Sequence, residues 1–294
     1  MQEKIFDDDF FQKLNTLKLS LNMRLNQGMS GARKSGAKGT SVEFSDFREY
    51  MLGDDIRRID WNAYGRMDKL FIKQFMEEKE GIYHIFLDTS KSMDYGEPKK
   101  SRLALQIAGA LSYLVLNNLD RVYVTQMQEN SLSEGKGLSG RNSYKKILAE
   151  LNGIRFDGRT TLSGSIMSRN MKGRGLSVII SDFLDPAGIE AALRYLKYKK
   201  QQIVLVQVLA REELTITKEG SLNLIDSETG DIVRVTVNRK MIESYEEELK
   251  KLKYRLSALA KKYEAEYILA AADESIDKVM FEGMQAGGFV MSKE

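Results

Sequence analysis

The stretch IYHIFLDTSKSM, residues 82–93, joins a bulky apolar run to a short polar one. Its first part is typical of a buried β-strand, because large apolar and aromatic residues dominate it up to Asp88. Hydroxyl residues follow at alternate positions, at Ser90 and Ser92. A carboxylate followed by two hydroxyls suits an active site or a metal site, and it also suits an ordinary strand that ends in a capped helix.

Segments with strand and helix patterns alternate from this stretch to the end of the chain. This alternation predicts an α/β fold, in which a doubly wound, mostly parallel sheet has helices on both faces, as in Rossmann-like domains. Further strands are predicted at 121–127, 176–182, 202–210 and 266–273, and helices at 102–119, 142–152, 160–171, 186–200, about 242–263 and 275–286.

Two parts of the chain depart from this alternation. The segment LNLIDSETGDIVRVTV, residues 222–237, predicts two short strands around a turn, which is an inserted β-hairpin. Near the N-terminus, leucines and a phenylalanine at steps of three and four predict an amphipathic helix over residues 8–27. A Gly/Ser-rich basic loop at 27–41 and a half-exposed strand at Leu70 to Met76 follow this helix. We therefore expect residues 1–80 to form an N-terminal helix and an irregular extension packed on the core, and residues 81–294 to form the main domain.

The composition excludes several classes of chemistry. The 294 residues are 42% hydrophobic and 30% charged, which is typical of a soluble globular protein. The chain has no cysteine, which excludes disulfides, thiol nucleophiles and thiolate zinc sites. Its one histidine, His84, lies inside the apolar run, which favours a packed strand residue over a catalytic base. No apolar run reaches the roughly 18 residues that span a bilayer, and the first residues lack the apolar core of a signal peptide. We expect a cytoplasmic protein without direct membrane insertion.

The net charge of +3 is unevenly distributed. Between Phe10 and Val42 there are basic residues and no acidic one, and such a segment could contact nucleic acid. The segment lacks interleaved aromatics and a recognisable nucleic-acid module, so we favour a solvated helix face followed by a mobile loop. We expect no nucleic-acid partner, although nucleic-acid binding stays an alternative function. The basic residues are Lys13, Lys18, Arg24, Arg33, Lys34 and Lys38.

Polar residues stand at two more junctions between strands and helices. Asp182 ends the predicted strand at 176–182, and Thr160 and Thr161 start a predicted helix. In an open parallel sheet, ligands bind beyond the carboxyl ends of the strands, where the strand order reverses. With Asp88, Ser90 and Ser92, these residues offer only oxygen ligands, which Mg²⁺ prefers. The sequence therefore predicts an all-oxygen cation site.

An enzymatic alternative uses the same aspartate. Phosphotransferases and hydrolases that depend on Mg²⁺ can use an aspartate after a buried strand as nucleophile. Those enzymes place a second carboxylate two positions later as acid and base, and here that position is Ser90. The chain also lacks a Walker-type phosphate-binding loop. We therefore assign no catalytic residue, and an enzyme that uses Asp88 is the alternative.

Two patterns in the chain resemble known families. Asp88-Thr-Ser90-Lys-Ser92, together with Thr160 and Asp182, resembles the metal-ion-dependent adhesion site of von Willebrand factor type A domains. The block EFSDFREY…GDDIRRIDW within residues 31–80 is similar to the signature of domain-of-unknown-function family 58. That bacterial and archaeal family carries such a block directly before a type A-like domain. The resemblance covers about residues 28–290.

The resemblance implies a type A-like domain that binds one Mg²⁺ or Mn²⁺. Ser90 and Ser92 would bind the cation through their hydroxyls, and Asp88 and Asp182 would bind it directly or through water. Thr160 would be the fifth ligand, preferred to the next threonine because T-x-L at 160–162 matches the usual helix start. The open coordination position would take an Asp or Glu carboxylate of a partner protein. Members of the family often accompany MoxR-type AAA+ ATPases, so the implied function is a non-enzymatic adaptor or assembly factor for such an ATPase.

The segment GDDIRRIDW, residues 53–61, allows two interpretations. Its aspartates, arginines and Trp61 could form a second binding surface. Alternatively, the aspartates pair with the arginines to hold an irregular loop while Trp61 anchors that loop on the domain. We favour the structural role, because such a polar cluster is costly to bury unless every charge is paired.

Overall fold

The computed structural model describes most of the chain, in two compact units. The described residues are 17–19, 42–67, 69–77, 80–128, 135–171, 173–185, 188–216, 220–225, 232–276, 278–283 and 290–292. The larger unit comprises Met1–Met23 and Gly81–Glu294, and the smaller one comprises Arg24–Glu80.

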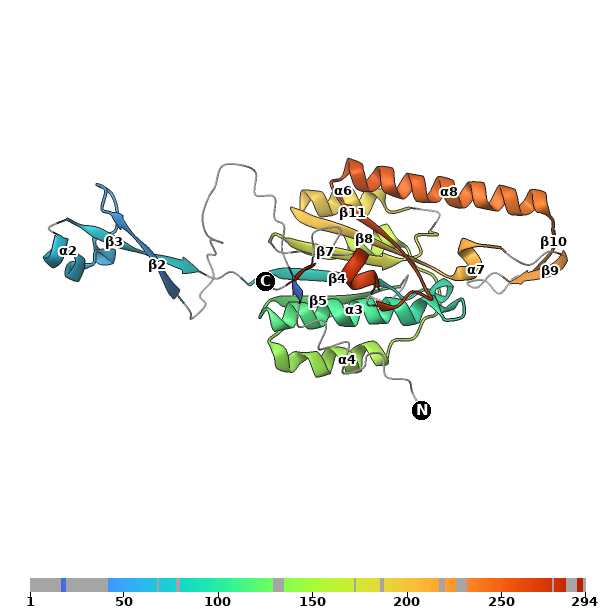
Figure 1. The fold of residues 1–294 in the computed structure, drawn as a ribbon, viewed down its shortest axis with the longest axis horizontal. Helices are drawn as coiled ribbons and strands as arrows, with labels where there is room; N and C mark the ends of the chain where they lie inside the picture. The colour runs from blue at the N-terminus through green and yellow to red at the C-terminus, as the bar shows by residue number, and fades with distance from the viewer. Residues whose placement is uncertain are drawn as a thin grey trace. The chain divides into compact units, whose positions relative to one another are not determined.

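A six-stranded sheet forms the centre of the larger unit (Figure 1). Five of its strands are parallel, and the short strand β6 joins one edge in the antiparallel direction. This architecture confirms the predicted doubly wound, mostly parallel sheet. The strand order is β11-β8-β7-β4-β5-β6, with bounds β4 (Ile82–Asp88), β5 (Arg121–Met127), β6 (Leu138–Ser139), β7 (Gly175–Ser181), β8 (Gln201–Leu209) and β11 (Glu266–Ala271).

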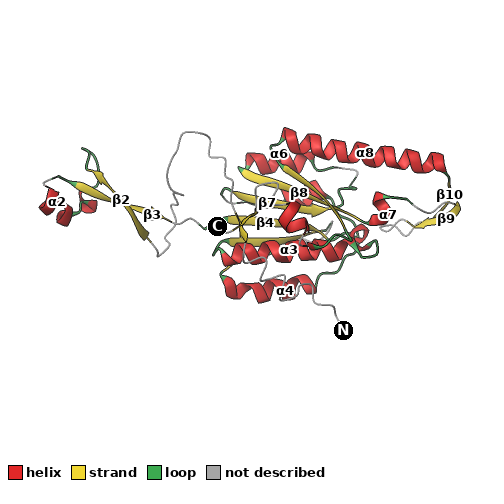
Figure 2. Cartoon of the chain, viewed as in Figure 1, coloured by secondary structure: helices red, strands yellow, loops and turns green. Residues whose placement is uncertain are grey.

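Helices cover both faces of this sheet, as Figure 2 shows. Side chains along β4 alternate between the faces, so Ile85 and Leu87 enter one core while Phe86 enters the other. The first core contains α3 (Lys100–Asn117) and α4 (Tyr144–Asn152). The second contains α5 (Leu162–Met167), α6 (Glu190–Tyr198) and α8 (Arg239–Lys262). Strands buried on both faces explain the continuous apolar runs in the sequence.

The strand order reverses between β4 and β7. The chain passes from β4 to β5 on one side, and it then crosses to place β7 on the other side of β4. The two strands run in register, with Leu87 opposite Ile180, so Asp88 and Ser181 end at the same edge. The crevice beyond the carboxyl ends at such a switch point is where α/β sheets bind ligands.

The predicted hairpin is confirmed, and two of the predicted terminal helices need correction. Strands β9 (Gly220–Ile225) and β10 (Ile232–Val237) pair antiparallel, while the turn between them lies outside the described residues. The helix predicted at 8–27 is wrong at Leu17–Leu19, which is strand β1, paired with β12 (Val290–Ser292). Pairing with a distant strand overrides the local helical spacing there, and the rest of that segment is not among the described residues. The helix predicted at 275–286 is a π-helical segment, η4, over Lys278–Gly283.

Other predicted helices differ in their bounds. The helix predicted at 160–171 is shorter and forms α5 only, and α6 begins after Ile189, later than predicted. A four-residue helix, α7 (Arg211–Leu214), follows β8 and was not predicted. Among the described helices, none combines the length and the hydropathy that crossing a bilayer requires.

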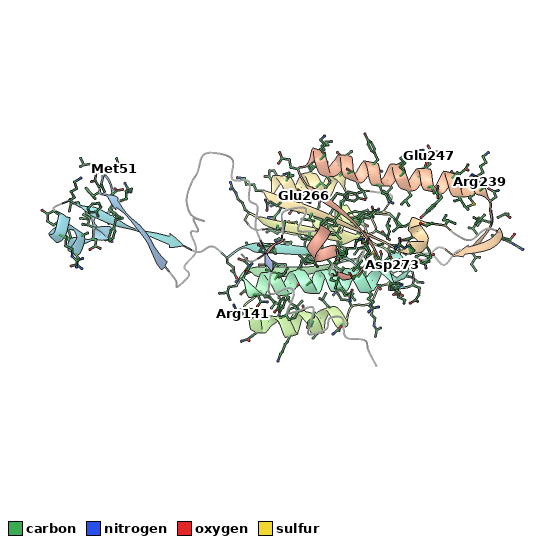
Figure 3. All side chains as sticks on the ribbon, in the orientation of Figure 1. Met51, Arg141, Arg239, Glu247, Glu266 and Asp273 are labelled. Carbon is green, nitrogen blue, oxygen red and sulfur yellow. The ribbon has the colours of Figure 1, made fainter. Side chains whose placement is uncertain are left out.

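The smaller unit is a two-stranded hairpin with short helices at its turn. Strands β2 (Val42–Glu49) and β3 (Phe71–Glu77) pair antiparallel, and η1 (Ile56–Arg58) and α2 (Trp61–Met67) lie between them. The strand predicted at Leu70 to Met76 is confirmed as β3, whereas β2 and α2 were not predicted. Figure 3 shows Met51, which is exposed, at the turn end of this unit.

Contacts inside the smaller unit hold the segment at residues 53–61. Asp54 forms an ion pair at 2.8 Å with Arg48, which lies outside this segment. Asp60 is buried and accepts hydrogen bonds from the main-chain N–H groups that start α2. Trp61 is 66% exposed and forms an edge-to-face pair with Tyr64. Its anchoring of the loop on the main domain stays a prediction, because the two units are described separately.

Candidate metal centre

Asp88 links the carboxyl ends of the two strands at the switch point. Its Oδ2 accepts a hydrogen bond from Ser181 Oγ, the last residue of β7, at 2.6 Å. Its Oδ1 accepts one from the main-chain N–H of Ser90 at 3.0 Å. The side chain is buried, and each of its two oxygens accepts a hydrogen bond from a donor within the protein. Asp88 holds β4, β7 and the following loop together.

Ser90, Ser92 and Asp182 form one hydrogen-bonded chain beside Asp88. The hydroxyls of Ser90 and Ser92 lie 3.0 Å apart, and Ser92 Oγ donates to Asp182 Oδ2 at 2.9 Å. Ser90 precedes the 3-10 helix η2 (Lys91–Asp94), but its side chain does not cap that helix. The structure thus brings together four of the five predicted ligands, and it contradicts the alternative in which the Ser90 hydroxyl is an ordinary helix cap.

Thr160 lies at the end of the neighbouring strand β5. Its Oγ1 donates to the carbonyl of Met127 at 2.7 Å, and the same carbonyl accepts from Thr89 Oγ1 at 3.0 Å. Gly158 brings this loop to η2, because its carbonyl accepts from Lys91 N at 3.0 Å and its φ of 68° favours glycine. Thr160 is thus fixed at the same edge of the sheet as Asp88, through β5 and not through the other four residues.

Lys100 and Glu213 belong to the site, and sequence reasoning missed both. Lys100 is the first residue of α3, and its Nζ donates to Asp182 Oδ2 at 2.8 Å and to Glu213 Oε1 at 2.7 Å. Glu213 lies in α7, and its Oε2 accepts from the main-chain N–H of Ala210 at 2.7 Å. The signal for Lys100 was weak: a lysine at the start of an apolar helix, where a positive charge opposes the helix dipole.

The site carries more negative than positive charge. Two carboxylates, those of Asp182 and Glu213, pair with the one ammonium group, that of Lys100, and a third carboxylate, that of Asp88, lies near Asp182. Burial raises the pKa of Asp88, and the nearby charge of Asp182 raises it further, although hydrogen bonds from Ser181 and Ser90 oppose this. Burial alone would lower the pKa of Lys100, but the two carboxylates outweigh burial and raise it. Lys100 is therefore a fixed positive charge.

The donor set suits a hard divalent cation. Two carboxylates and two serine hydroxyls converge at a sheet edge, and all are oxygen ligands. The excess of negative charge makes the binding of a divalent cation electrostatically favourable. Ser92 and Thr160 are only half-buried, so the cluster opens to solvent on their side. No group of three or more His, Cys, Asp or Glu side chains suited to a metal occurs among the described residues, so a cation here would rely on hydroxyl ligands.

His84 lies outside this cluster. It is buried in β4, stacked against the rings of Tyr123 at 4.9 Å and Phe86 at 6.1 Å. Burial, with a smaller effect of the Arg169 charge, lowers the pKa of His84 to about 4. The imidazole is therefore neutral near pH 7, which agrees with its interpretation as a packed strand residue.

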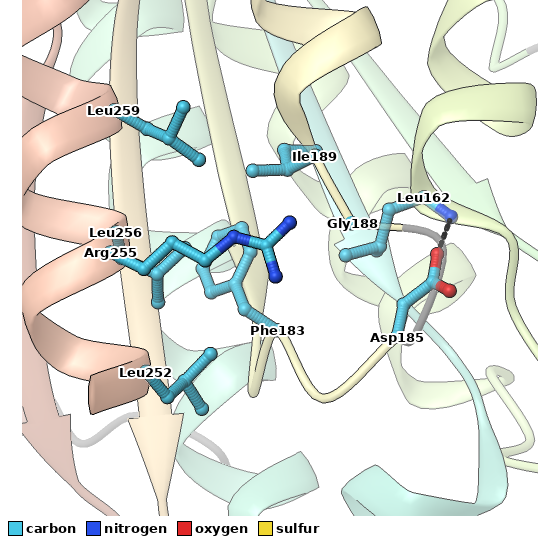
Figure 4. A pocket seen from close by; sticks show the side chains of 9 residues that line it. All are labelled: Leu162, Phe183, Asp185, Gly188, Ile189, Leu252, Arg255, Leu256 and Leu259. Atoms are coloured by element: carbon cyan, nitrogen blue, oxygen red, sulfur yellow. Dashed lines mark hydrogen bonds between the residues drawn. The ribbon is translucent and has the colours of Figure 1, made fainter. Parts of the chain in front are cut away.

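A small cavity of about 30 Å³ lies near the site, between α8 and the loop after β7 (Figure 4). Phe183, which directly follows Asp182, lines it together with Arg255 of α8. Asp185 also lines it, and its Oδ2 accepts from the main-chain N–H of Leu162 at 2.9 Å. The cavity is mainly apolar and too small for more than a water molecule or two.

Most of the basic segment on which the nucleic-acid alternative depends lies outside the described residues. Of its six basic residues, only Lys18, in β1, lies within the described part of the chain.

A family model, described as a protein of unknown function and named DUF58, matches residues 46–254. The chain belongs to the DUF58 family. The match spans most of the smaller unit and the larger unit from β4 into α8. This confirms the family resemblance that the sequence shows around EFSDFREY and GDDIRRIDW.

Relatives of this DUF58 protein include uncharacterized proteins of Mycobacterium bovis and Mycobacterium tuberculosis. Each is 24% identical over 250 residues, which cover 82% of this chain and 78% of the relative. Among solved structures, an aerotolerance-related membrane protein from Bacteroides fragilis is similar at 18% identity and a TM-score of 0.44, over 70% of this chain and 97% of that one. BatB from Bacteroides thetaiotaomicron is similar at 16% identity and a TM-score of 0.43, over 71% and 98%. The VWA domain of SpRpn10 is similar at 10% identity and a TM-score of 0.38, over 69% and 95%.

Proposed function

We propose that this DUF58 protein is a non-enzymatic protein-interaction module that binds a partner carboxylate through a divalent cation at the switch point. Ser90 and Ser92 bind Mg²⁺ or Mn²⁺ through their hydroxyls, and Asp88 and Asp182 bind it directly or through water. Thr160 completes the set from the end of β5. When bound, the cation supplies an open coordination position for an Asp or Glu of the partner.

One observation carries this proposal: the unbroken set of hydrogen bonds that joins the four residues. It runs from Asp88 through the loop at Ser90 to Ser92 and Asp182, although Asp182 is 90 residues from Ser92. Such convergence at the sheet's switch point is what a ligand site requires and a helix cap does not. The surplus of carboxylates supports a cation as the ligand, because a divalent ion offsets the repulsion among them.

The residue two positions after Asp88 favours an interaction module over a phosphotransferase. A hydroxyl, that of Ser90, occupies the position where the phosphotransferase needs its acid and base.

We propose a MoxR-type AAA+ ATPase as the partner, on the strength of the family resemblance. The protein would serve such an ATPase as an adaptor or assembly factor. Such a partner must present an exposed Asp or Glu that reaches the cation, because the open coordination position accepts an anionic oxygen.

A binding assay between the two purified proteins tests this function. We expect a MoxR-type ATPase to be retained by the immobilised wild type in Mg²⁺ and released by EDTA. Asp88→Asn should lose retention in Mg²⁺ at least tenfold, because it removes one charge from the cation site. Because Asp88→Asn and the wild type are compared at the same Mg²⁺ concentration, any difference in retention comes from the cation site and not from an effect of Mg²⁺ on the ATPase.

Asp120→Asn is the matched control. Asp120 is also a buried carboxylate that accepts a main-chain N–H, from Gly81 at 2.7 Å, but it precedes β5 at the opposite end of the sheet. This variant should bind like the wild type. Equal retention by wild type and both variants, with or without EDTA, would rule out a cation-bridged partner.

A further inference from the structure

Lys100 is a lysine with no exposed surface, located next to the candidate metal ligands. A buried ammonium group is costly unless charged partners surround it. Lys100 has two, Asp182 Oδ2 at 2.8 Å and Glu213 Oε1 at 2.7 Å, and the ring of Tyr95 lies 5.9 Å from its Nζ. The protein thus contains a positive charge of its own at the site that is proposed to bind a cation.

Lys100 and the serine chain contact the same oxygen atom. Asp182 Oδ2 accepts from Lys100 Nζ at 2.8 Å and from Ser92 Oγ at 2.9 Å. A divalent cation that Ser92 and Asp182 bind would therefore lie close to the ammonium group and be repelled by it. In a partly buried site, this repulsion is several times stronger than in water.

Glu213 fixes the other side of the lysine. Its second oxygen accepts from Ala210 N at 2.7 Å, and its main-chain carbonyl accepts from Tyr245 of α8 at 2.9 Å. The carboxylate is therefore held in place independently of Lys100. It keeps a partner for the ammonium group when another cation engages Asp182.

We propose that Lys100 is the internal counter-ion of this site, and that the Lys100–Glu213 pair sets the affinity of the site for divalent cations. Without a cation, Lys100 holds Asp182 in position toward Ser92, so that the ligands are already arranged. With a cation, its positive charge weakens binding, and Glu213 limits that weakening. This inference rests on the proposed function and adds a residue that tunes it.

Charge substitutions at the pair predict an order of affinities. The four side chains Asp88, Asp182, Glu213 and Lys100 carry a formal charge of two negative units. Lys100→Met raises the negative charge to three units, and Glu213→Gln lowers it to one unit. The double variant restores two negative units. Divalent-cation affinity should therefore be highest in Lys100→Met, similar in the wild type and the double variant, and lowest in Glu213→Gln.

Isothermal titration of the full-length protein with Mn²⁺, at about pH 8 and low ionic strength, measures this order. We expect Lys100→Met to bind at least about tenfold more tightly than the wild type, and Glu213→Gln at least about tenfold more weakly, each about 1.4 kcal/mol. The double variant should lie within about threefold of the wild type, because the net charge is the same. If Lys100→Met does not fold, Glu213→Gln and the double variant still test the order, since both avoid an unpaired buried carboxylate at position 213.

Glu274→Gln is a matched control for Glu213→Gln. Glu274 follows β11, accepts from Ala271 N and pairs with Lys278 at 2.6 Å, which repeats the arrangement of Glu213 with a different lysine. This control should bind Mn²⁺ like the wild type. If the wild type binds Mn²⁺, and Lys100→Met and Glu213→Gln bind it with the same affinity, the role of Lys100 is overturned and the proposed function stands. An absence of saturable Mn²⁺ binding in the wild type would overturn the proposed function and this inference together.

Discussion

Asp182 is the residue on which the site depends most. One of its oxygens accepts from Ser92 and Lys100, the other accepts from Leu184 N, and its main-chain carbonyl accepts from Gln207 of β8 at 2.9 Å. It therefore joins the loop after β4, the start of α3 and the neighbouring strand. Phe183, which follows it, has a φ of 58°, an uncommon value for a residue with a side chain.

His84 supplies the prediction at this scale, and it concerns acid stability. The imidazole of His84 has its ordinary pKa of 6.5 in the unfolded chain. In the folded protein, burial disfavours the charged form and lowers this pKa to about 4. The unfolded state therefore binds more protons between these values, and stability falls as the pH falls. The free energy of unfolding should drop by about 2 kcal/mol from about pH 7.5 to about pH 5 on account of His84.

Urea unfolding of the wild type and His84→Phe at both pH values measures this contribution. Phenylalanine keeps the stacking on Tyr123 without a titratable group. Because all carboxylates are common to both proteins, the difference between their pH dependences isolates the imidazole. Identical pH dependences in the two proteins would contradict a buried neutral histidine.

Some site residues could be predicted from the sequence, and others could not, for a physical reason. Asp88 and Asp182 end apolar runs, so the pattern alone places them at strand ends. Lys100 and Glu213 stand in charged segments that look solvated, and their pairing spans 113 residues. Burial of a lysine depends on partners that only the fold brings together, and local sequence does not record them.

At the scale of elements, the connection from β4 through η2 to α3 builds most of the site. This one segment supplies Asp88, Ser90, Ser92 and Lys100. The loop that directly follows β7 and the helix α7 supply their partners from the other side of the switch point. The sequence predicts the strands of this sheet well, because burial on both faces leaves uninterrupted apolar runs. It fails for β1 and β2, whose pairing partners lie far along the chain or beyond a long turn.

Gly175 supplies the prediction for the elements, since it sets how closely β7 approaches β4. A Cβ atom at this position would lie 2.2 Å from the carbonyl oxygen of Ile82. Gly175→Ala should therefore force the two strands apart and lower the free energy of unfolding by about 1–3 kcal/mol, as overpacking does. Urea unfolding measures this loss.

Gly153→Ala serves as the reference substitution. A Cβ atom there would meet main-chain oxygens at 3.5 Å, an ordinary contact, at the end of α4. Its effect should stay below about 1 kcal/mol, since an unstrained surface substitution changes little. Equal stability of the two alanine variants would show that the strands do not approach as closely as described.

At the scale of the whole molecule, the proposed function belongs to the larger unit. The DUF58 match nevertheless spans both units, so the hairpin of β2 and β3 is part of what defines the family. The sequence identified that family from the block around GDDIRRIDW, because a long run of specific residues is informative even where no periodicity reveals its structure. The architecture of the block, with α2 at the turn and Trp61 exposed, could not be read from the sequence.

The location of a bound cation tests the central claim most directly. Crystals of the full-length protein grown with MnCl₂ would show Mn²⁺ in an anomalous difference map. We predict one strong peak at the carboxyl ends of β4 and β7, about 2.0–2.3 Å from the hydroxyl oxygens of Ser90 and Ser92, as coordination by oxygen requires. A map with no peak between Ser90, Ser92 and Asp182, from crystals in which Mn²⁺ occupies other sites, would contradict the claim.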